Sequence, residues 1–286
     1  MSKPVVVVIG VGGMGREIAR RQGSGAQLVA ADFDEELLAS AADELTADGY
    51  DVTPVRVDVS ERASVAHLAR AAAALGPVTR VAHTAGLSPV QAPTAAVLAV
   101  DLLGVALVLE EFGAVVAAGG AGVVIASMAG HMAPLPPEVE SALRSTPTDE
   151  LLSLPFLRPD ALSDPGAAYA LAKRANHLRV QAAARAWGAR GARINSVSPG
   201  VISTRMGRAE LAGEHGSPMR SMIETSPAAR PGTPNDIAEA TSFLLSPSAS
   251  FITGTDLLVD GGVVATRPHQ APAAFEQRGP GQRPAS

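Results

Sequence analysis

Seven short apolar runs recur along this 286-residue chain, with longer alanine-rich stretches between them. The runs are rich in β-branched residues and nearly free of polar ones, as expected of strands buried on both faces of a parallel sheet. Each stretch between them is long enough for a crossover helix. The pattern predicts an α/β fold, a single doubly wound domain with a seven-stranded, mainly parallel sheet and helices on both faces. The expected strands are Val5–Ile9, Gln27–Ala31, Val52–Val57, Val78–His83, Gly122–Ser127, Arg193–Ser198 and Asp256–Val259.

Composition narrows the class of protein further. With 47% hydrophobic and 18% charged residues the chain is typical of a globular protein. The absence of cysteine excludes disulfides, thiolate metal sites and a cysteine nucleophile, and we expect no metal site. A net charge of −5 disfavours nucleic acid as a partner. No signal pattern precedes the first strand, and the apolar stretch at 95–119 carries three acids, so we expect no membrane span and a cytoplasmic protein.

A glycine-rich loop directly follows the first expected strand. The sequence Gly10-Val-Gly12-Gly-Met14-Gly15 would let backbone N–H groups approach a pyrophosphate at the start of the following helix. The next strand ends at Asp32, 22 residues after Gly10, where a carboxylate can accept hydrogen bonds from the adenosine ribose. Phe33 and Asp34 follow, rather than a base that would bind a 2′-phosphate. The sequence therefore favours NAD(H), while nearby Arg16 leaves NADP(H) open.

Tyr169 and Lys173 lie four residues apart in the helix expected over Ala167–Trp187. This spacing puts both on one helical face, and a nearby ammonium lowers the pKa of a phenol toward the range that a general acid/base needs. The chain has two tyrosines, two lysines and 21 arginines, so lysine at this position is unusual. A compact ammonium suits ribose hydroxyls and a phenol better than a planar guanidinium does. The alternative is a surface pair on an alanine-rich helix.

Together these motifs resemble the classical short-chain dehydrogenase/reductase family over about Pro4–Val263. The other segments that carry the resemblance are Asp58-Val59, Thr84-Ala85-Gly86, Ala126-Ser127-Met128-Ala129-Gly130, Asn195-Ser-Val-Ser-Pro199-Gly200 with Thr204, and Asp260-Gly261-Gly262. The resemblance implies a Rossmann-like domain over residues 1–265 and an enzyme that transfers hydride between NAD(P) and an alcohol or carbonyl group.

The resemblance also implies roles for individual residues. Ser127 would polarise the substrate oxygen, Tyr169 would exchange the proton, and Lys173 would hold the nicotinamide ribose while lowering the tyrosine pKa. The implied cofactor-binding residues are Gly10, Gly12, Met14, Gly15, Asp32, Phe33, Asp58, Val59, Ala85, Gly86, Tyr169, Lys173, Pro199, Gly200, Ile202 and Thr204. The alternative for Ser127 is a helix cap or turn, and for Asp58 a helix cap.

The chain departs from the family pattern in three places. Its glycine loop is one residue shorter than TGxxxGxG and lacks the threonine. Asp101 stands where the family commonly has the asparagine of a proton relay, and an ionised carboxylate cannot donate a hydrogen bond. Asp101 therefore keeps a relay water, raises the pKa of Tyr169, or is simply a buried or interface acid. The third departure is the separation of Ser127 and Tyr169 by 42 residues, where family members have a short loop.

Residues 131–166 make up the extra segment. It contains seven prolines, between which only short helices fit, over Glu138–Arg144 and Thr148–Leu152. It resembles the subgroup that includes bacterial 3α-hydroxysteroid dehydrogenase/carbonyl reductase, in which an insertion at this place contributes to a substrate cover. Its apolar content suits a lid, with an oligomer contact or a mobile loop as alternatives. Residues 266–286 lack periodicity and are expected to form a flexible tail.

The sequence thus predicts an NAD(H)-dependent oxidoreductase that interconverts a small-molecule secondary alcohol and ketone, bulky or hydrophobic in kind. The family resemblance implies a homodimer or homotetramer through the helices expected over Ala95–Ala118 and Ala167–Trp187. Two alternatives stay open. One is a dinucleotide-binding sensor or scaffold that has kept the fold without turnover, and the other is an NADP-dependent carbonyl reductase.

Overall fold

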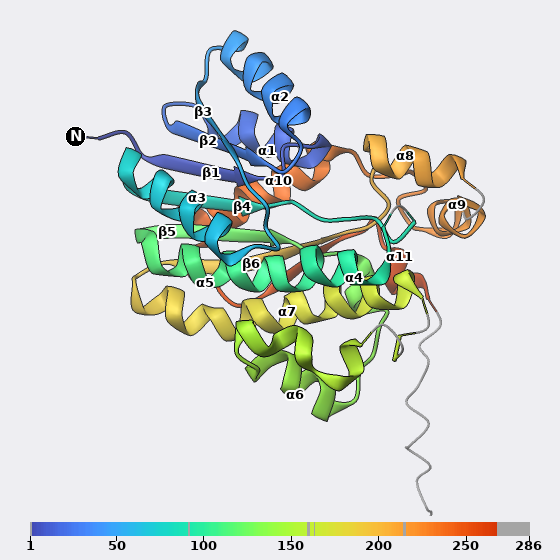
Figure 1. Cartoon of the computed structure of the whole chain (residues 1–286). Coiled ribbons are helices and arrows are strands. Elements are labelled where there is room, and N and C mark those ends of the chain that lie inside the picture. The colour runs from blue at the N-terminus through green and yellow to red at the C-terminus, as the bar shows by residue number, and fades with distance from the viewer. Residues whose placement is uncertain (1, 91, 159–160, 163, 214–215, 268–286) are drawn as a thin grey trace, which may run out of the picture.

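Figure 1 shows the computed structural model of the chain, which describes residues 2–90, 92–158, 161–162, 164–213 and 216–267. All strand pairs are parallel, in the order β3-β2-β1-β4-β5-β6-β7. The strands are β1 (Val5–Ile9), β2 (Gln27–Asp32), β3 (Asp51–Arg56), β4 (Val78–His83), β5 (Val116–Ile125), β6 (Arg193–Pro199) and β7 (Asp256–Val259). The predicted doubly wound fold is confirmed. The strand order reverses between β1 and β4, where sheets of this kind bind ligands at the carboxyl ends of their strands.

Strand β1 shows why the strand sequences are apolar throughout. Val5, Val7 and Ile9 pack into the core on one face of the sheet, whereas Val6 and Val8 pack into the core on the other. Helices cover both faces, so neither set of side chains meets water. The first core is covered by α3 (Arg62–Leu75), α5 (Val105–Val115) and α7 (Pro165–Ala189), and the second by α1 (Gly13–Gln22), α2 (Glu35–Ala47) and α10 (Pro234–Leu245).

The long helical region before β5 is divided into three parts and is shorter than predicted. It comprises α4 (Thr94–Val97), a π-helical turn η1 (Leu98–Gly104) and α5, which ends at Val115. The expected helix to Ala118 and strand from Gly122 are therefore wrong at this junction, because β5 already begins at Val116. The glycines at 119 and 120 are poor helix formers, and Gly119 has a φ of 79°, which few other residues adopt.

The described part of segment 131–166 folds into short helices that pack beside α7 (Figure 1). They are α6 (Pro137–Ser145) and the 3₁₀ turns η3 (Thr148–Ser153) and η4 (Pro155–Leu157), so both short helices expected there are present. Leu143, Leu151 and Leu157 are buried in a third apolar core, against residues of α4, η1 and α7. These leucines therefore attach the segment to the domain, and the role of its other residues as a substrate cover stays a prediction.

The remaining helices lie around the carboxyl ends of the strands, except for one short turn between α10 and β7, which lies beside the start of β6. They are η2 (Met128–His131), α8 (Arg205–Ala212), α9 (Gly216–Thr225), η5 (Pro247–Ala249) and α11 (Val263–Thr266). Thr266, the first residue of the predicted tail, ends α11, and residues 268–286 lie outside the described part of the chain. Among the described residues, no helix combines the length and the apolarity needed to cross a membrane.

Candidate active site

The glycine loop is packed tightly against the end of β4. Gly10 has a φ of 90°, and a Cβ there would lie 2.5 Å from the amide nitrogen of Ala85. A Cβ on Gly15 would lie 1.8 Å from the carbonyl oxygen of Gly10. The Thr84 hydroxyl donates to that carbonyl at 2.6 Å. These contacts explain why glycine is needed at both positions, although the loop is shorter than the family pattern.

Gly12 serves a different purpose. Apart from Gly12 and its two neighbours in the chain, no described residue has an atom within 4 Å of the position that a Cβ on Gly12 would take. Gly12 is also the residue before helix α1, so its backbone borders open space at a helix N-terminus. Such a position suits the close approach of a phosphate. The side chain of Met14, by contrast, packs into the core behind the loop.

A cavity of about 500 Å³ opens where β1, β2, β3 and β4 end. It brings together half of the predicted cofactor-binding residues: Gly10, Gly12, Asp32, Phe33, Asp58, Val59, Ala85 and Gly86. Its other lining residues, which the sequence motifs did not single out, are Leu37, Val57, Ser60, Leu87, Ala96, Ala99, Val100 and Met206. The largely apolar wall and the few polar groups are typical of a site for a flat, partly polar ligand such as a dinucleotide.

Asp32 is oriented by the backbone around it. Its carboxylate accepts from the N–H of Val11 at 2.8 Å and from the N–H of Asp34 at 3.1 Å. Asp58, on the next strand end, accepts from the N–H and the hydroxyl of Ser60 at 2.9 and 2.6 Å. Both carboxylates are therefore held at the rim of the cavity with lone pairs left for a ligand.

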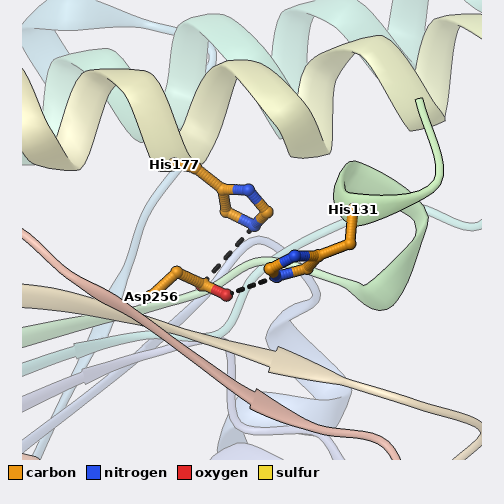
Figure 2. Close-up of side chains that lie close together, drawn as sticks. All are labelled: His131, His177 and Asp256. Atoms are coloured by element: carbon orange, nitrogen blue, oxygen red, sulfur yellow. Dashed lines mark hydrogen bonds and ion pairs between the residues drawn. The ribbon is translucent and has the colours of Figure 1, made fainter. Parts of the chain in front are cut away.

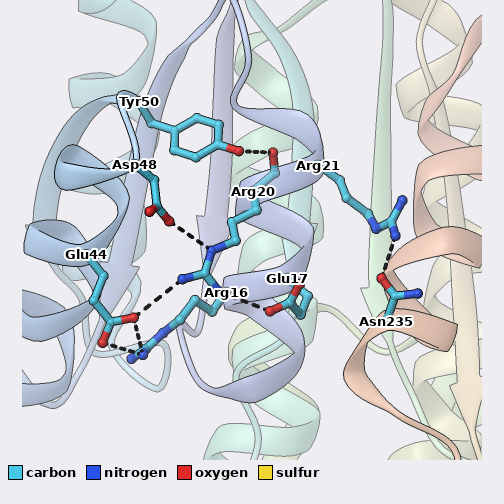
Figure 3. Close-up of polar contacts among 8 residues, drawn as sticks. All are labelled: Arg16, Glu17, Arg20, Arg21, Glu44, Asp48, Tyr50 and Asn235. Atoms are coloured by element: carbon cyan, nitrogen blue, oxygen red, sulfur yellow. Dashed lines mark hydrogen bonds and ion pairs between the residues drawn. The ribbon is translucent and has the colours of Figure 1, made fainter.

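Arg16 forms an ion pair with Glu44 (Figure 3) and does not line the cavity. Its Nη1 donates to both carboxylate oxygens of Glu44 at 2.8 Å. On the same helix, Arg20 donates to Glu17 and Asp48, and its carbonyl accepts from the Tyr50 hydroxyl. These contacts tie α1 to α2 and to the turn before β3, so the guanidinium of Arg16 already has a carboxylate partner.

Tyr169, Lys173 and Ser127 lie together as predicted, although they come from two elements. Helix α7 carries the first two, and the ammonium of Lys173 lies 5.3 Å from the centre of the Tyr169 ring. Ser127 follows β5 and caps η2, where its Oγ accepts from the N–H of Ala129 at 3.2 Å. The helix cap that the sequence offered as the alternative role for Ser127 is therefore present. The Ser127 hydroxyl also lies near enough to the phenol of Tyr169 to lower its pKa.

Two sets of groups act on the phenol in opposite directions. Burial raises the pKa of Tyr169, and so do the carboxylates of Asp101 and Glu210. The ammonium of Lys173 and the hydroxyl of Ser127 lower that pKa, but the raising effects are larger. The expected influence of Lys173 is present, therefore, and it is outweighed. The phenol is the favoured form of Tyr169 at neutral pH.

Asp101 forms an ion pair with Lys173. Its Oδ1 lies 2.9 Å from Nζ, and both side chains are almost completely buried. Burial alone would lower the pKa of Lys173, but Asp101 and Tyr169 together raise it. The carboxylate also accepts from the N–H of Leu87 at 3.1 Å, and a Cβ on Gly86 would lie 2.6 Å from Oδ1. The π-helical turn η1 supplies Asp101 to this position.

Glu210 is a residue of this region that the sequence motifs missed. It lies on α8, the Ser88 hydroxyl donates to its carboxylate, and its charge raises the pKa of Tyr169. Met206, one turn earlier on the same helix, lines the cavity. The sequence offered one signal for Glu210. Met206 and Glu210 are four residues apart, which puts both side chains on one face of the helix that follows Thr204 and begins beside the crevice.

The segment that follows β6 packs against the glycine loop and against the end of β7. Thr204 caps α8 by accepting from the N–H of Gly207 at 3.0 Å, and a Cβ on Gly13 would lie 3.2 Å from its methyl group. Gly200 passes so close to β7 that a Cβ would lie 2.6 Å from the Cα of Asp260. Pro199, Gly200, Ile202 and Thr204 do not line the cavity, so their predicted contacts with a cofactor stay predictions.

Comparisons with known proteins agree with this geometry. Residues 3–136 match the family described as short chain dehydrogenase, and residues 152–264 match one described as Enoyl-(Acyl carrier protein) reductase. The chain is 40% identical to the short-chain dehydrogenase/reductase bsc3 of Alternaria brassicicola, over 93% of this chain and 97% of the relative. The chain belongs to the short-chain dehydrogenase/reductase family.

Other short-chain dehydrogenases/reductases resemble it over most of its length. Galactitol 2-dehydrogenase (L-tagatose-forming) of Cereibacter sphaeroides is 31% identical over 89% of this chain and 92% of its own. The solved structure of levodione reductase superposes with a TM-score of 0.73 at 25% identity, covering 93% of this chain and 100% of that one. A shorter match, 35% identical over 36% of this chain and 40% of the relative, is to 3-alpha-hydroxysteroid dehydrogenase/carbonyl reductase of Comamonas testosteroni.

Membership of this family settles the type of protein. It is an oxidoreductase of the short-chain dehydrogenase/reductase family, whose members bind NAD(P)(H) and act on alcohols and ketones. The predicted family and enzyme class are confirmed.

Proposed function

We propose that this protein is an NAD(H)-dependent oxidoreductase that interconverts a bulky, largely apolar secondary alcohol and its ketone. The observation that carries the proposal is that Tyr169 and Lys173 lie beside the dinucleotide-sized cavity: a Cβ on Gly86, which lines the cavity, would lie 3.4 Å from Nζ of Lys173. Assembly into a homodimer or homotetramer is a proposal that rests on the family resemblance, and location in the cytoplasm stays a prediction.

The residues at the cavity fit a dinucleotide. The space beside Gly12 is open at the start of α1, and Asp32 stands at the end of β2 with its carboxylate already oriented. Asp32 would bind the adenosine ribose hydroxyls, and its negative charge would repel a 2′-phosphate. Arg16 is paired with Glu44 and does not line the cavity, so it is poorly placed to offset that repulsion. These contacts support NAD(H).

One observation favours the NADP(H) alternative. Arg56 lies over the ring of Phe33, with its guanidinium carbon 4.8 Å from the ring centre, directly beside Asp32 in the sheet. Its partner Glu35 is exposed, so their ion pair at 3.1 Å contributes little and could open. Arg56 is thus the cation best placed to meet a 2′-phosphate, and we include it in the test of cofactor preference.

The chain supplies the proton and the positioning for the reaction. A bound nicotinamide cofactor supplies or accepts the hydride. Tyr169 would pass the proton to or from the substrate oxygen, and Ser127 would donate a hydrogen bond to that oxygen as charge develops on it. Since the pKa of Tyr169 is raised, the residue is a proton donor at neutral pH. The site therefore favours reduction of a ketone at neutral pH and oxidation of an alcohol at alkaline pH.

The surroundings of Ser127 on the side of α8 and α9 are apolar. Met128, next to Ser127, belongs to a cluster with Val201 and Val263, and residues of α8 and α9 pack against it. Met132, at the start of segment 131–166, joins the same cluster. The other members are Leu211, Met219, Met222, Ile223, Leu258 and Val264. A wall rich in methionine adapts to large apolar groups, which supports a bulky substrate.

The decisive experiment is a panel of ketones and secondary alcohols, graded in size, assayed with NAD(H) and NADP(H). We expect turnover with large cyclic ketones and NADH, and a loss of about 100-fold or more in Tyr169→Phe. Turnover that prefers small polyols would refute the substrate class. Tight NADH binding with no turnover by the wild type across the panel would instead favour the non-catalytic sensor or scaffold.

A further inference from the structure

Two histidines and an aspartate lie close together where η2, α7 and β7 meet (Figure 2). His131 ends η2, four residues after Ser127, and His177 lies on α7, one turn after Lys173. Asp256 is the first residue of β7. Three elements far apart in the sequence thus bring one ligand-type atom each to a common point, and these atoms all lie within 4.8 Å of one another. The reaction proposed above uses none of the three side chains.

The distances are close to those of a tetrahedral metal site. Nitrogen and oxygen ligands bind Zn²⁺ at about 2.0 to 2.2 Å, so two ligands of one ion lie about 3.3 Å apart. Nε2 of His177 is 3.5 Å from one carboxylate oxygen of Asp256. Nε2 of His131 is 2.7 Å from the other, and this contact must widen by several tenths of an ångström. The side chain of His131 is 28% exposed and sits on a short turn, so it has room to make that movement.

The groups around Asp256 are arranged as they are around metal-binding carboxylates. The hydroxyls of Ser196 and Ser198 lie 2.6 and 3.0 Å from Oδ1. They fix the plane of the carboxylate and leave Oδ2 facing His131. Such outer hydrogen bonds orient ligands and raise metal affinity. Ser198 also lies 2.8 Å from Nε2 of His177, and an ion bound to that nitrogen replaces this hydrogen bond.

The donor set selects the kind of ion. Two imidazoles and one carboxylate suit Zn²⁺ and its neighbours Co²⁺ and Ni²⁺, whereas Mg²⁺ and Ca²⁺ prefer oxygen ligands alone. We propose that His131, His177 and Asp256 form a binding site for a divalent transition-metal ion, Zn²⁺ above all. The fourth position belongs to water or a serine hydroxyl.

The ion joins the turn after Ser127 to the helix of Tyr169 and Lys173. This junction is already tight, because a Cβ on Gly130 would lie 2.8 Å from both the His177 ring and the Lys173 backbone. An ion there fixes η2 against α7 and β7 without touching the reacting atoms. Its effect is therefore stabilisation of the fold around the catalytic serine, whichever substrate the enzyme uses.

The test measures Zn²⁺ binding by calorimetry and by the shift in Tm, using the full-length chain stripped with a chelator and desalted. We expect one ion per chain, a Tm increase with Zn²⁺, and none with Mg²⁺. His131→Ala and Asp256→Asn each weaken binding by at least about 10- to 100-fold. His67→Ala, at an exposed histidine on α3, is the matched control and binds like the wild type. Co²⁺ in place of Zn²⁺ gives the strong visible absorption of a four-coordinate ion.

Two outcomes would overturn the site. One is equal Zn²⁺ affinity in the wild type, His131→Ala and His67→Ala, which would place binding elsewhere. The other is a wild type with no saturable Zn²⁺ binding, which would leave a hydrogen-bond network only. His131→Ala changes a partly exposed residue and keeps the test valid even where Asp256→Asn misfolds.

Discussion

The carboxylate of Asp101 lies 2.9 Å from the ammonium of Lys173, and both groups are buried. This pair makes the charge at the centre of the site nearly neutral. It also explains how a lysine can be buried beside a tyrosine while the pKa of that tyrosine stays raised.

Asp101→Asn should move the pH profile of alcohol oxidation. The change removes the negative charge that raises the pKa of Tyr169 and leaves Lys173 free to lower it. Because oxidation needs the phenolate, the acidic limb of kcat/KM should shift down by about one pH unit, equal to about 1.4 kcal/mol. Glu138→Gln, at an exposed acid on α6, is the control and should leave the profile in place. An unshifted limb in Asp101→Asn would show that Asp101 has no electrostatic role.

Replacing Gly15 or Gly12 of the loop by alanine should affect different properties, stability in the first case and NADH binding in the second. Gly15→Ala places a methyl group against the Gly10 carbonyl and should cost about 1 to 3 kcal/mol of stability or more. Gly12→Ala meets no described atom, so its Tm should stay near that of the wild type while NADH binding weakens about 10-fold or more. Calorimetry and thermal melts separate the two effects. A Gly12→Ala variant with unchanged NADH affinity would mean that the cofactor does not approach this backbone.

Cofactor preference should depend on Asp32 and not on Arg16. Asp32→Ser removes the repulsion of a 2′-phosphate and should raise NADPH affinity relative to NADH by about 10-fold or more, on the scale of a few kcal/mol for a nearby charge. Arg16→Ala should leave the ratio unchanged, since Glu44 already binds the guanidinium. Fluorescence titrations of both variants give the ratios. A wild type that binds NADPH more tightly, with the preference lost in Arg16→Ala or Arg56→Ala, would support the NADP alternative.

His83 should make the fold sensitive to acid. It is buried at the end of β4, neither ring nitrogen has a hydrogen-bond partner among the described residues, and burial lowers its pKa to about 3. An unfolded histidine has a pKa near 6.5, so the neutral form is favoured by folding. Its stabilising effect is complete above pH 6.5 and is lost as the pH falls toward 3. Denaturant titrations should show a smaller loss over this range in His83→Leu; an equal loss in both proteins would be inconsistent with this role.

Much of the fold was predictable because it depends on local patterns. Continuous apolar runs such as Val5–Ile9 mark strands buried on both faces, and each of the seven expected strands is present. The junction between α5 and β5 was not predictable, because alanines and valines near residue 116 suit a helix or a strand, and the pairing of Val116 with Val78 decides between them.

The residues of the candidate site also fall into a group that local sequence patterns indicate and a group that only the folded structure brings together. The glycine loop and the pair Tyr169 and Lys173 have fixed spacings, so the sequence alone indicates them. The partners of Asp101 and Glu210 depend on how η1 and α8 are placed against α7 and β4, which no short motif encodes. The cluster of His131, His177 and Asp256 was missed for that reason, since its members are separated by 46 and 79 residues and meet only in the folded sheet.

The rate of hydride transfer in a single turnover tests the central claim most directly. A ketone accepted by the wild type is mixed with an excess of enzyme saturated with NADH, and NADH oxidation is followed in the wild type and in Tyr169→Phe. We predict that the variant reacts about 10²- to 10⁴-fold more slowly while its Kd for NADH stays within about twofold. Equal rates in the two proteins would contradict the assignment of Tyr169 as the proton donor.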